Sequence, residues 1–130
     1  MRPSMVLGLV LVILAGCGSN ETVVFEEAFP LLLDGRKFNL TVGPGKQNVK
    51  HKIVASATAP INIYVYPSGD DEAVKRDLDE GHTTLRLIAY QENKENFDFE
   101  ASLAPDSNSI VYFRRAAGPA NVKLKITTKK

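Results

Sequence analysis

The chain has 130 residues, a formal net charge of +1 and one cysteine. This length suits a single domain with one hydrophobic core, and one cysteine excludes a disulfide within the chain. The near balance of 16 basic and 15 acidic side chains argues against nucleic acid as a partner, because phosphate binding needs clustered excess Lys and Arg.

The first predicted element is an export signal. Arg2 is the only charged residue among the first twenty, and residues 5–14 are apolar without interruption. This run is shorter than the roughly 20 residues that a membrane-spanning helix needs. A positive start, an apolar centre and small residues before a cleavage site are typical of a secretory signal. An uncleaved anchor or a buried helix is the alternative.

The end of this segment, Leu14-Ala15-Gly16-Cys17, resembles the lipobox of bacterial lipoproteins. In that family the cysteine thiol carries a diacylglycerol, and the signal is cut before the cysteine. The resemblance therefore implies a signal peptide over residues 1–16 and a lipid attachment at Cys17. Because two or more acyl chains anchor a protein stably, we expect the mature protein to be held at the membrane of the cell envelope. In a Gram-negative host this is the outer membrane, since no aspartate follows Cys17.

We expect residues 17–22 to be a tether and residues 23–130 to be one β-rich domain. Runs rich in β-branched and aromatic residues recur about every ten positions, with turn residues between them. Phe38, Leu40 and Val42 share one face of their run, which is typical of an antiparallel sheet with one buried face. The predicted strands span residues 23–29, 36–42, 48–57, 61–66, 84–91, 96–103, 109–115 and 121–128.

These eight strands predict an all-β fold, a single antiparallel β-sandwich of jelly-roll type. One short helix is expected over residues 70–80, where Val74 and Leu78 share a face and Gly81 can end the helix. Ser68 and Asp71 have the spacing of a capping box. The predicted core consists of Phe38, Leu40, Ile53, Ile63, Leu87, Phe97, Phe99, Val122, Leu124 and Ile126.

The order of these parts resembles two groups of β-sandwich modules, the bacterial pre-peptidase C-terminal domains and the GOLD-type jelly rolls. The resemblance lies in residues 35–42, a charged strand after a turn, and in residues 61–66 and 122–126. Both groups are accessory or interaction modules. The resemblance therefore implies a non-catalytic binding or structural domain.

A candidate binding surface follows from the tyrosines. If Ile63 and Val65 face the core, Tyr64 and Tyr66 project from the opposite face of the same strand. Exposed tyrosines near a guanidinium are typical of surfaces that bind proteins or sugars, so the expected partner is an envelope protein or polysaccharide. Ordinary cross-strand packing on a half-covered face is the alternative. The predicted surface comprises Tyr64, Tyr66, Arg114 and Arg115.

The sequence contains no motif for a catalytic nucleophile, a phosphate loop or a cofactor, so no catalytic residue, metal or cofactor is predicted. The alternative is an envelope hydrolase or metal-dependent enzyme. It would use His51 as a base or ligand, or bind Ca²⁺ through the acidic residues of 70–80. The simpler interpretations are a solvated histidine near a strand end and a solvated helix face. The hypotheses differ in whether His51, His82 and several carboxylates converge in one pocket. The acidic residues are Asp70, Asp71, Glu72, Asp77, Asp79 and Glu80.

Overall fold

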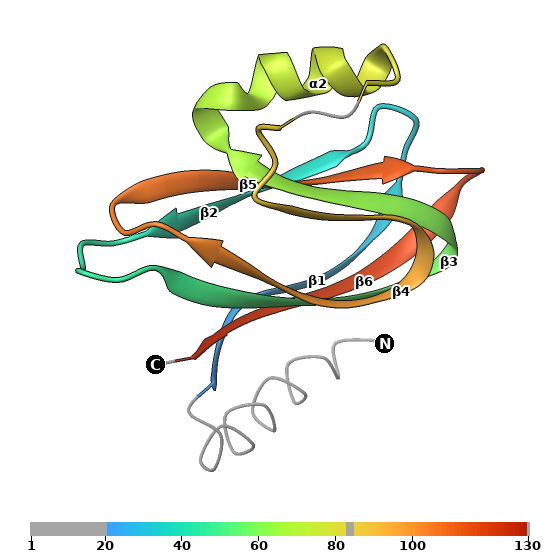
Figure 1. Ribbon diagram of the computed structural model, residues 1–130. Coiled ribbons are helices and arrows are strands. Elements are labelled where there is room, and N and C mark those ends of the chain that lie inside the picture. Colours follow the sequence, from blue (N-terminus) through green and yellow to red (C-terminus); the bar gives the residue numbers. More distant parts are fainter. Residues whose placement is uncertain (1–20, 83–84, 130) are drawn as a thin grey trace.

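The computed structural model describes residues 21–82 and 85–129, so the predicted signal and the lipid attachment site lie outside the described residues. The described part is an antiparallel β-structure with one short helix, which confirms the predicted all-β fold (Figure 1). None of its helices is long and apolar enough to span a membrane. The elements in chain order are β1 (Glu21–Leu31), β2 (Arg36–Val42), β3 (Val49–Pro67), the 3-10 turn η2 (Ser68–Asp70), the helix α2 (Asp71–Asp79), β4 (Ala89–Leu103), β5 (Ser107–Arg115) and β6 (Ala120–Lys129).

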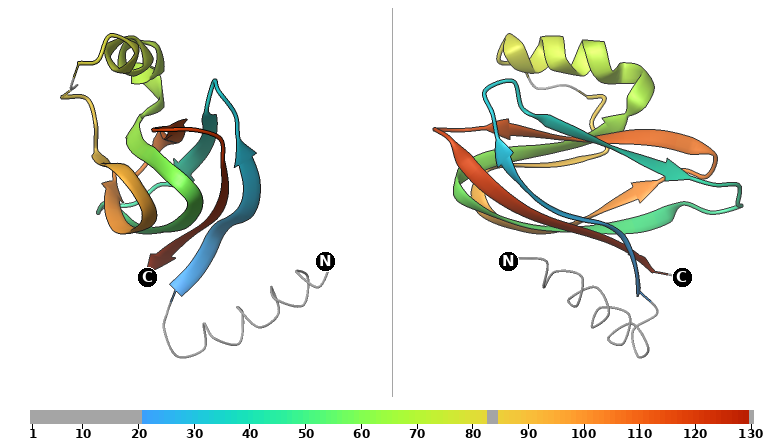
Figure 2. Two further views of the ribbon diagram at one scale, coloured as in Figure 1. Left: turned by 90° about the vertical axis from the view of Figure 1, so that its right-hand side faces the viewer. Right: turned by 180° about the vertical axis from the view of Figure 1, so that it is seen from behind.

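The sheet folds into two layers because its longest strand changes partner. Residues 51–57 of β3 pair with β6, whereas residues 61–67 pair with β5. On its other side β3 pairs with β4 through both parts. The lower layer in Figure 1 therefore contains β1, β6 and the first part of β3, and the upper layer contains β2, β5 and the last part of β3. The strand β4 passes from the upper layer to the lower one, and the two layers face each other as in a sandwich (Figure 2).

The described residues form six strands rather than eight, because two predicted breaks are bends within continuous strands. Pro60 lies where β3 exchanges β6 for β5, so its missing N–H removes no bond from a ladder. In β4 the bend contains Asn93, which has a positive φ of 58° and donates its backbone N–H to the Asn62 side chain at 2.7 Å. Residues 85–88 were predicted as strand, but β4 begins only at Ala89.

The main core lies between the two layers. Strand alternation places the predicted apolar faces there, and eight of the ten predicted core side chains are buried. Phe99 is partly buried against the same core, whereas Leu87 packs elsewhere, beneath α2. Burial of each large aliphatic or aromatic side chain contributes about 1.5–3 kcal/mol. This contribution is why the alternating strands form a stable pair of layers.

The predicted helix is present as α2. It ends as its sequence indicates, because Gly81 adopts a φ of +77° and donates its N–H to Leu78 O, while His82 donates to Asp77 O. These two bonds form a Schellman motif. The predicted capping box is wrong, because Ser68 belongs to η2 and no side chain caps the start of the helix. The first strand also begins earlier than predicted, so Glu21 and Thr22 belong to β1 and not to a tether.

Candidate functional site

All four tyrosines of the chain lie on the outer face of the upper layer. Tyr64 of β3 pairs with Tyr112 of β5 on one side and with Tyr90 of β4 on the other, so three rings form a row across the strands. Tyr66 lies two residues further along β3 and shares this face by strand alternation. We call this outer surface the tyrosine face.

Most of the tyrosine face is covered by α2, which lies above the upper layer in Figures 1 and 2. The fully buried Val74 of α2 forms a second small core with Tyr64, Tyr66, Tyr112 and Ile110. Tyr64 is 3% exposed and Tyr66 is 0% exposed, so the prediction that these two side chains form an exposed surface is wrong. Strand alternation places both side chains on the face that α2 covers. Ordinary packing beneath the helix therefore accounts for the positions of both rings.

Polar contacts fasten α2 to the tyrosine face at both of its ends. At the first turn, Asp71 accepts hydrogen bonds from the hydroxyl of Tyr66 at 2.7 Å and from Lys37 Nζ at 2.8 Å. At the last turn, Asp79 forms an ion pair of 2.9 Å with Arg114 Nη1. Burial raises the pKa of Tyr66, and the hydrogen bond to the Asp71 carboxylate raises it further. The Asp71 carboxylate therefore accepts its hydrogen bond from a neutral phenol.

The end of the tyrosine face beyond α2 remains open. Tyr90 is 47% exposed, and its ring stacks on Tyr64 with an interplanar angle of 18° and a centroid separation of 6.3 Å. The Tyr64 hydroxyl donates to Glu92 Oε2, and burial followed by this bond raises the Tyr64 pKa. Arg114 and Asn62 pair across β5 and β3 and are half-buried next to Tyr64. We call Tyr90, Glu92, Asn62 and Arg114 the Tyr90 platform.

The two predicted arginines project in opposite directions. Arg114 lies on the tyrosine face, with its guanidinium carbon 5.8 Å from the centroid of the Tyr112 ring. Arg115 is the next residue of the strand and pairs with the fully buried Ile61, so it turns toward the other face. The structure therefore separates Arg115 from the other three residues of the predicted surface. Tyr90 was not part of the predicted surface, although its exposure makes it the accessible tyrosine.

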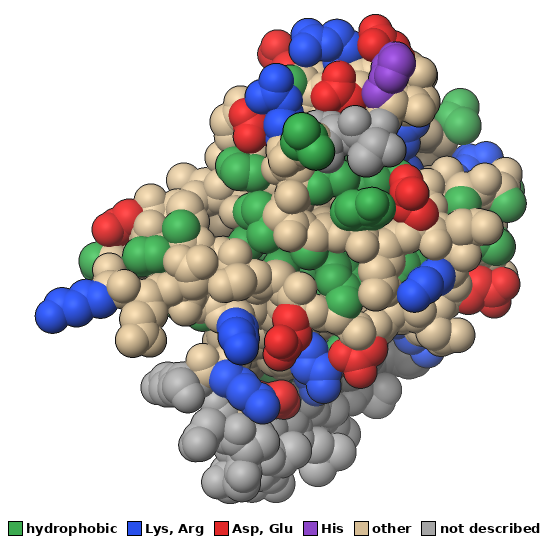
Figure 3. Space-filling view, viewed as in Figure 1, with side chains coloured by type: hydrophobic (Ala, Val, Ile, Leu, Met, Phe, Trp, Pro, Cys, Tyr) green, Lys and Arg blue, Asp and Glu red, His purple; other side chains and the backbone are tan. Residues whose placement is uncertain are grey.

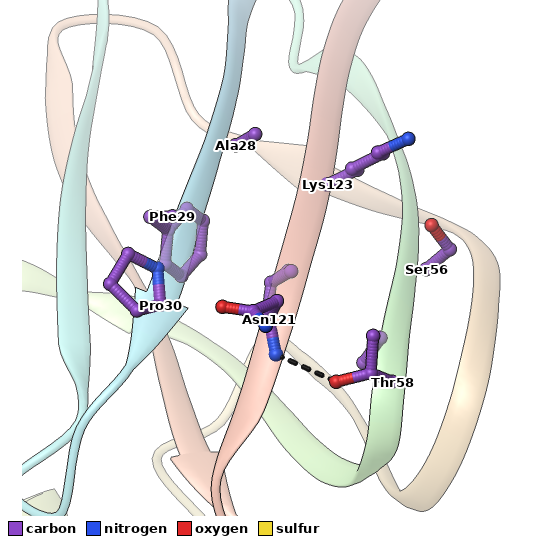
Figure 4. A pocket seen from close by; sticks show the side chains of 9 residues that line it. Ala28, Phe29, Pro30, Ser56, Thr58, Asn121 and Lys123 are labelled. Atoms are coloured by element: carbon purple, nitrogen blue, oxygen red, sulfur yellow. Dashed lines mark hydrogen bonds between the residues drawn. The ribbon is translucent and has the colours of Figure 1, made fainter.

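The lower layer carries a groove that the sequence did not indicate (Figure 4). Its volume is about 500 Å³, within the range of about 300–1,000 Å³ that is typical of ligand sites. Ser56, Thr58, Asn121 and Lys123 supply polar groups, and the backbone N–H of Asn121 donates to Thr58 Oγ1 at 2.9 Å. The groove is built from β1, β3 and β6, so its residues become neighbours only through strand pairing.

The candidate groups for catalysis lie apart. His51 is 3% exposed and faces the core of the lower layer, with Nδ1 3.2 Å from Val49 O, so the expectation of a solvated histidine is wrong. Burial lowers the pKa of His51, and the contact with Val49 opposes this effect only in part. His82 follows α2, over the upper layer, and lies 3.9 Å from Glu80. The described residues contain no group of three or more side chains arranged to hold a metal ion.

No family model matches the chain, and no characterised protein sequence matches it. Two solved structures are similar in their strand arrangement. A carbohydrate-binding module, CsCBM6-3 from Clostridium stercorarium in complex with cellobiose, is 15% identical, with 87% of this chain and 85% of that chain covered and a TM-score of 0.40. The Yersinia pseudotuberculosis-derived mitogen is 10% identical, with 76% of this chain and 88% of that chain covered and a TM-score of 0.38. Neither similarity says what this chain binds.

Proposed function

We propose that this protein is a lipid-anchored, non-catalytic module of the cell envelope that binds a polysaccharide through the Tyr90 platform. One observation carries the proposal. An exposed tyrosine ring is held against a buried one, and a carboxylate, an amide and a guanidinium lie around the pair. A sugar ring has an apolar face that stacks on an aromatic ring and hydroxyl groups that bond to such polar neighbours.

The platform is also held rigidly before any ligand binds. Tyr64 is fixed by its burial and by its hydrogen bond to Glu92, and the Asn62 side chain is fixed by its bond to Asn93. A preorganised site loses less conformational entropy on binding than a mobile one. Hydrophobic side chains gather below α2 on the side of the molecule that Figure 3 shows. Leu85, Ile88 and Tyr90, which are close together in the sequence, are exposed. An exposed apolar patch of this kind is typical of interaction sites.

The position of β1 supports a role close to a membrane. The strand begins at Glu21, only four residues after Cys17. Four residues span at most about 14 Å, so acyl chains on Cys17 would hold the domain next to the bilayer. The start of β1 and the helix α2 lie on opposite sides of the molecule (Figure 1). The Tyr90 platform would therefore face away from the membrane.

The absence of catalysis is part of the proposal. His51 is enclosed in the core. Of the α2 carboxylates, Asp71 binds both Tyr66 and Lys37, and Asp79 binds Arg114. These groups stabilise the packing of the fold, which supports a binding module over an envelope hydrolase. Cleavage of a bound polysaccharide by the purified protein, abolished by a substitution of His51, would reverse this assignment.

Binding is tested with the mature lipidated protein in detergent, run by affinity electrophoresis through gels containing neutral envelope polysaccharides. We expect retardation by at least one polysaccharide and a loss of affinity of about tenfold in Tyr90→Ala, because stacking on the ring is removed. Tyr90→Phe should keep most of the affinity. Leu33→Ala is the matched control, because Leu33 is also exposed but lies between β1 and β2. Equal affinity of Tyr90→Ala and the wild type would refute the platform, and retardation by none of the polysaccharides would refute polysaccharide binding.

The lipid anchor needs its own test. Mass spectrometry of the mature protein should show an N-terminal Cys17 with a diacylglycerol, and no residue of the segment 1–16. The variant Cys17→Ser should remain unprocessed and should not label with radioactive fatty acid. Recovery of an unmodified Cys17, or of a chain that retains Met1, would contradict the anchor. In a Gram-negative host, fractionation should place the protein in the outer membrane.

A further inference from the structure

The outer face of the lower layer has an ordered distribution of charge. The strand order across this layer is β1, β6, β3 and β4. On the outer face, the two central strands carry lysines and no carboxylate, whereas the two edge strands carry the acidic side chains. The lysines are Lys123, Lys125 and Lys129 of β6 and Lys50 and Lys52 of β3, and we call them the lysine stripe. The acidic residues are Glu21 and Glu26 of β1 and Asp98 and Glu100 of β4.

The stripe is narrow and extended. Lys129 lies six positions after Lys123, and each residue of a strand contributes about 3.4 Å, so the stripe is about 20 Å long. Its two strands lie about 5 Å apart. This shape matches several consecutive units of one extended polymer chain.

The charges of the stripe are largely available to a ligand. Lys52 lies 3.9 Å from Asp98, but both side chains are exposed, and such a pair contributes little. No ion pair joins Lys123 or Lys125 to another of the described residues. Lys125 stands opposite Glu26 of β1 and Val54 of β3, so a carboxylate is near it on one side only.

The groove of the lower layer lies at one end of the stripe. Its lining includes Lys123 with Ser56, Thr58 and Asn121, all of which can donate hydrogen bonds, and it includes no carboxylate. Lys123 and Ser56 project from neighbouring strands in Figure 4. A second hollow of about 190 Å³ lies at the other end, lined by Lys50, Lys52 and Lys129 of the stripe and by Glu21, Asp98 and Glu100 of the edge strands. The stripe therefore joins two hollows, and the larger one suits a ligand rich in acceptor oxygens.

We propose that the lysine stripe binds a linear anionic glycan, which lies along β6 and β3 and places its carboxylate or phosphate groups on the lysines. The flanking carboxylates argue against a flat anionic membrane. Such a surface would face all five lysines and all four acidic residues within a screening length of about 8–10 Å, and their effects would nearly cancel. A single chain between the two edges contacts the lysines directly, and repulsion from the edges aligns it with the strands. This second site goes beyond the Tyr90 platform and lies on the opposite layer.

The test uses the mature lipidated protein anchored in neutral phosphatidylcholine nanodiscs. Polygalacturonate is the carboxylate probe, dextran phosphate is the phosphate probe, and hydroxyethyl cellulose is the neutral polymer. We expect at least one anionic polymer to bind, and the double variant Lys123→Gln/Lys125→Gln to lose about tenfold in affinity at low salt. The slope of log affinity against log salt should also become shallower by about 1.4–1.8, because two charge contacts are lost. The anionic polymer that binds more tightly shows whether the stripe prefers carboxylate or phosphate groups.

The matched control is Lys46→Gln/Lys94→Gln, which removes the same charge from exposed positions outside the stripe and should bind as the wild type does. Equal losses in both double variants would mean that only net charge matters, and they would overturn the site. Failure of both anionic polymers to bind would also overturn it. Single-stranded DNA bound as tightly as the preferred polymer would refute a glycan. Thermal unfolding checks that each variant is folded, and the single variant Lys129→Gln gives an independent measurement at the far end of the stripe.

A last experiment distinguishes binding of the glycan from binding of the membrane surface. In nanodiscs that contain phosphatidylglycerol, the wild type should keep its advantage in polymer affinity over Lys123→Gln/Lys125→Gln. Loss of that advantage would show that anionic lipid occupies the stripe, which would overturn the proposal. Tyr90→Ala should bind the anionic polymer normally. The two proposals can therefore fail independently, because their variants lie on opposite layers.

Discussion

The hydroxyl of Tyr66 donates a hydrogen bond of 2.7 Å to Asp71, and this bond joins the upper layer to the first turn of α2. Lys37 of the edge strand β2 binds the other carboxylate oxygen of Asp71 at 2.8 Å. One carboxylate thus connects β2, β3 and the helix. Because the Tyr90 platform lies beside the covered part of the same face, the stability of this connection bears on the candidate site.

Asp71 should make the stability of the protein sensitive to acid. Burial alone would raise its pKa, but hydrogen bonds from Lys37 and Tyr66 and the charge of Lys37 hold the pKa below its ordinary value of 3.8. An acid with a lowered folded pKa stabilises the fold above its unfolded pKa, and this stabilisation is lost as the pH falls through the folded pKa. We therefore expect the free energy of unfolding to decrease below about pH 4, and to decrease less in Asp71→Asn.

Urea unfolding at several pH values measures this difference. At neutral pH, Asp71→Asn and Tyr66→Phe should each cost about 1 kcal/mol, because the first weakens and the second removes the charge-assisted hydrogen bond between these residues. Asp34→Asn, in the turn between β1 and β2, is the control and should keep the acid dependence of the wild type. An unchanged acid profile in Asp71→Asn would contradict the assignment.

The buried tyrosines should resist ionisation in alkali. Burial raises the pKa of Tyr64, Tyr66 and Tyr112 above the ordinary value of 10.0. Because the folded pKa is raised, the stabilisation is complete below the unfolded pKa of about 10 and is lost as the pH rises above it. We expect the ultraviolet absorbance of these three phenolates to appear together with the loss of near-ultraviolet circular dichroism. Ionisation of all four tyrosines in a protein with a native spectrum would show that α2 does not cover the face.

His51 should contribute a second pH dependence in a different range. Burial lowers the pKa of His51, so the folded protein holds the neutral imidazole. The unfolded chain binds a proton at a pKa of about 6.5, and stability should therefore fall as the pH decreases below that value. His51→Leu should remove this dependence and leave polysaccharide binding unchanged. Titration of the imidazole by NMR gives the direct measurement, and an ordinary pKa in the folded protein would refute its burial.

Gly35 is predicted to tolerate no side chain. It adopts a φ of +82°, and a Cβ at this position would lie 2.5 Å from Phe113 O and 2.8 Å from Tyr112 Cε1. Gly35→Ala should cost at least about 1–3 kcal/mol, because backbone strain adds to the overlap. Gly118→Ala is the matched control, since its Cβ would meet open space, and it should change stability by less than about 0.5 kcal/mol. The midpoints of urea unfolding of the two variants measure this difference. Similar midpoints would contradict the close contact between Gly35 and β5.

The local features of the sequence predicted the strands and the helix well. Phe38, Leu40 and Val42 alternate on one side of a strand, and all three are buried in the main core. The glycine after α2 indicated where the helix ends. Such patterns can be interpreted from sequence because they reflect the geometry of a single strand or helical turn. The predicted break between residues 57 and 61 is wrong, because β3 continues through the point where it exchanges β6 for β5, and this exchange of partners is not visible locally.

The tertiary structure decided which side chains are exposed and which residues lie next to one another. Strand alternation correctly predicted that Tyr64 and Tyr66 share one face. The packing of α2 decided that both are buried and that Tyr90 is not. Likewise Lys125 and Val54 are 71 positions apart in the sequence, and only the pairing of β6 with β3 makes them neighbours. Alternation is a property of one strand, and the sequence by itself determined it. Which face remains open, and which charges lie side by side, depends on long-range pairing that only the folded chain establishes.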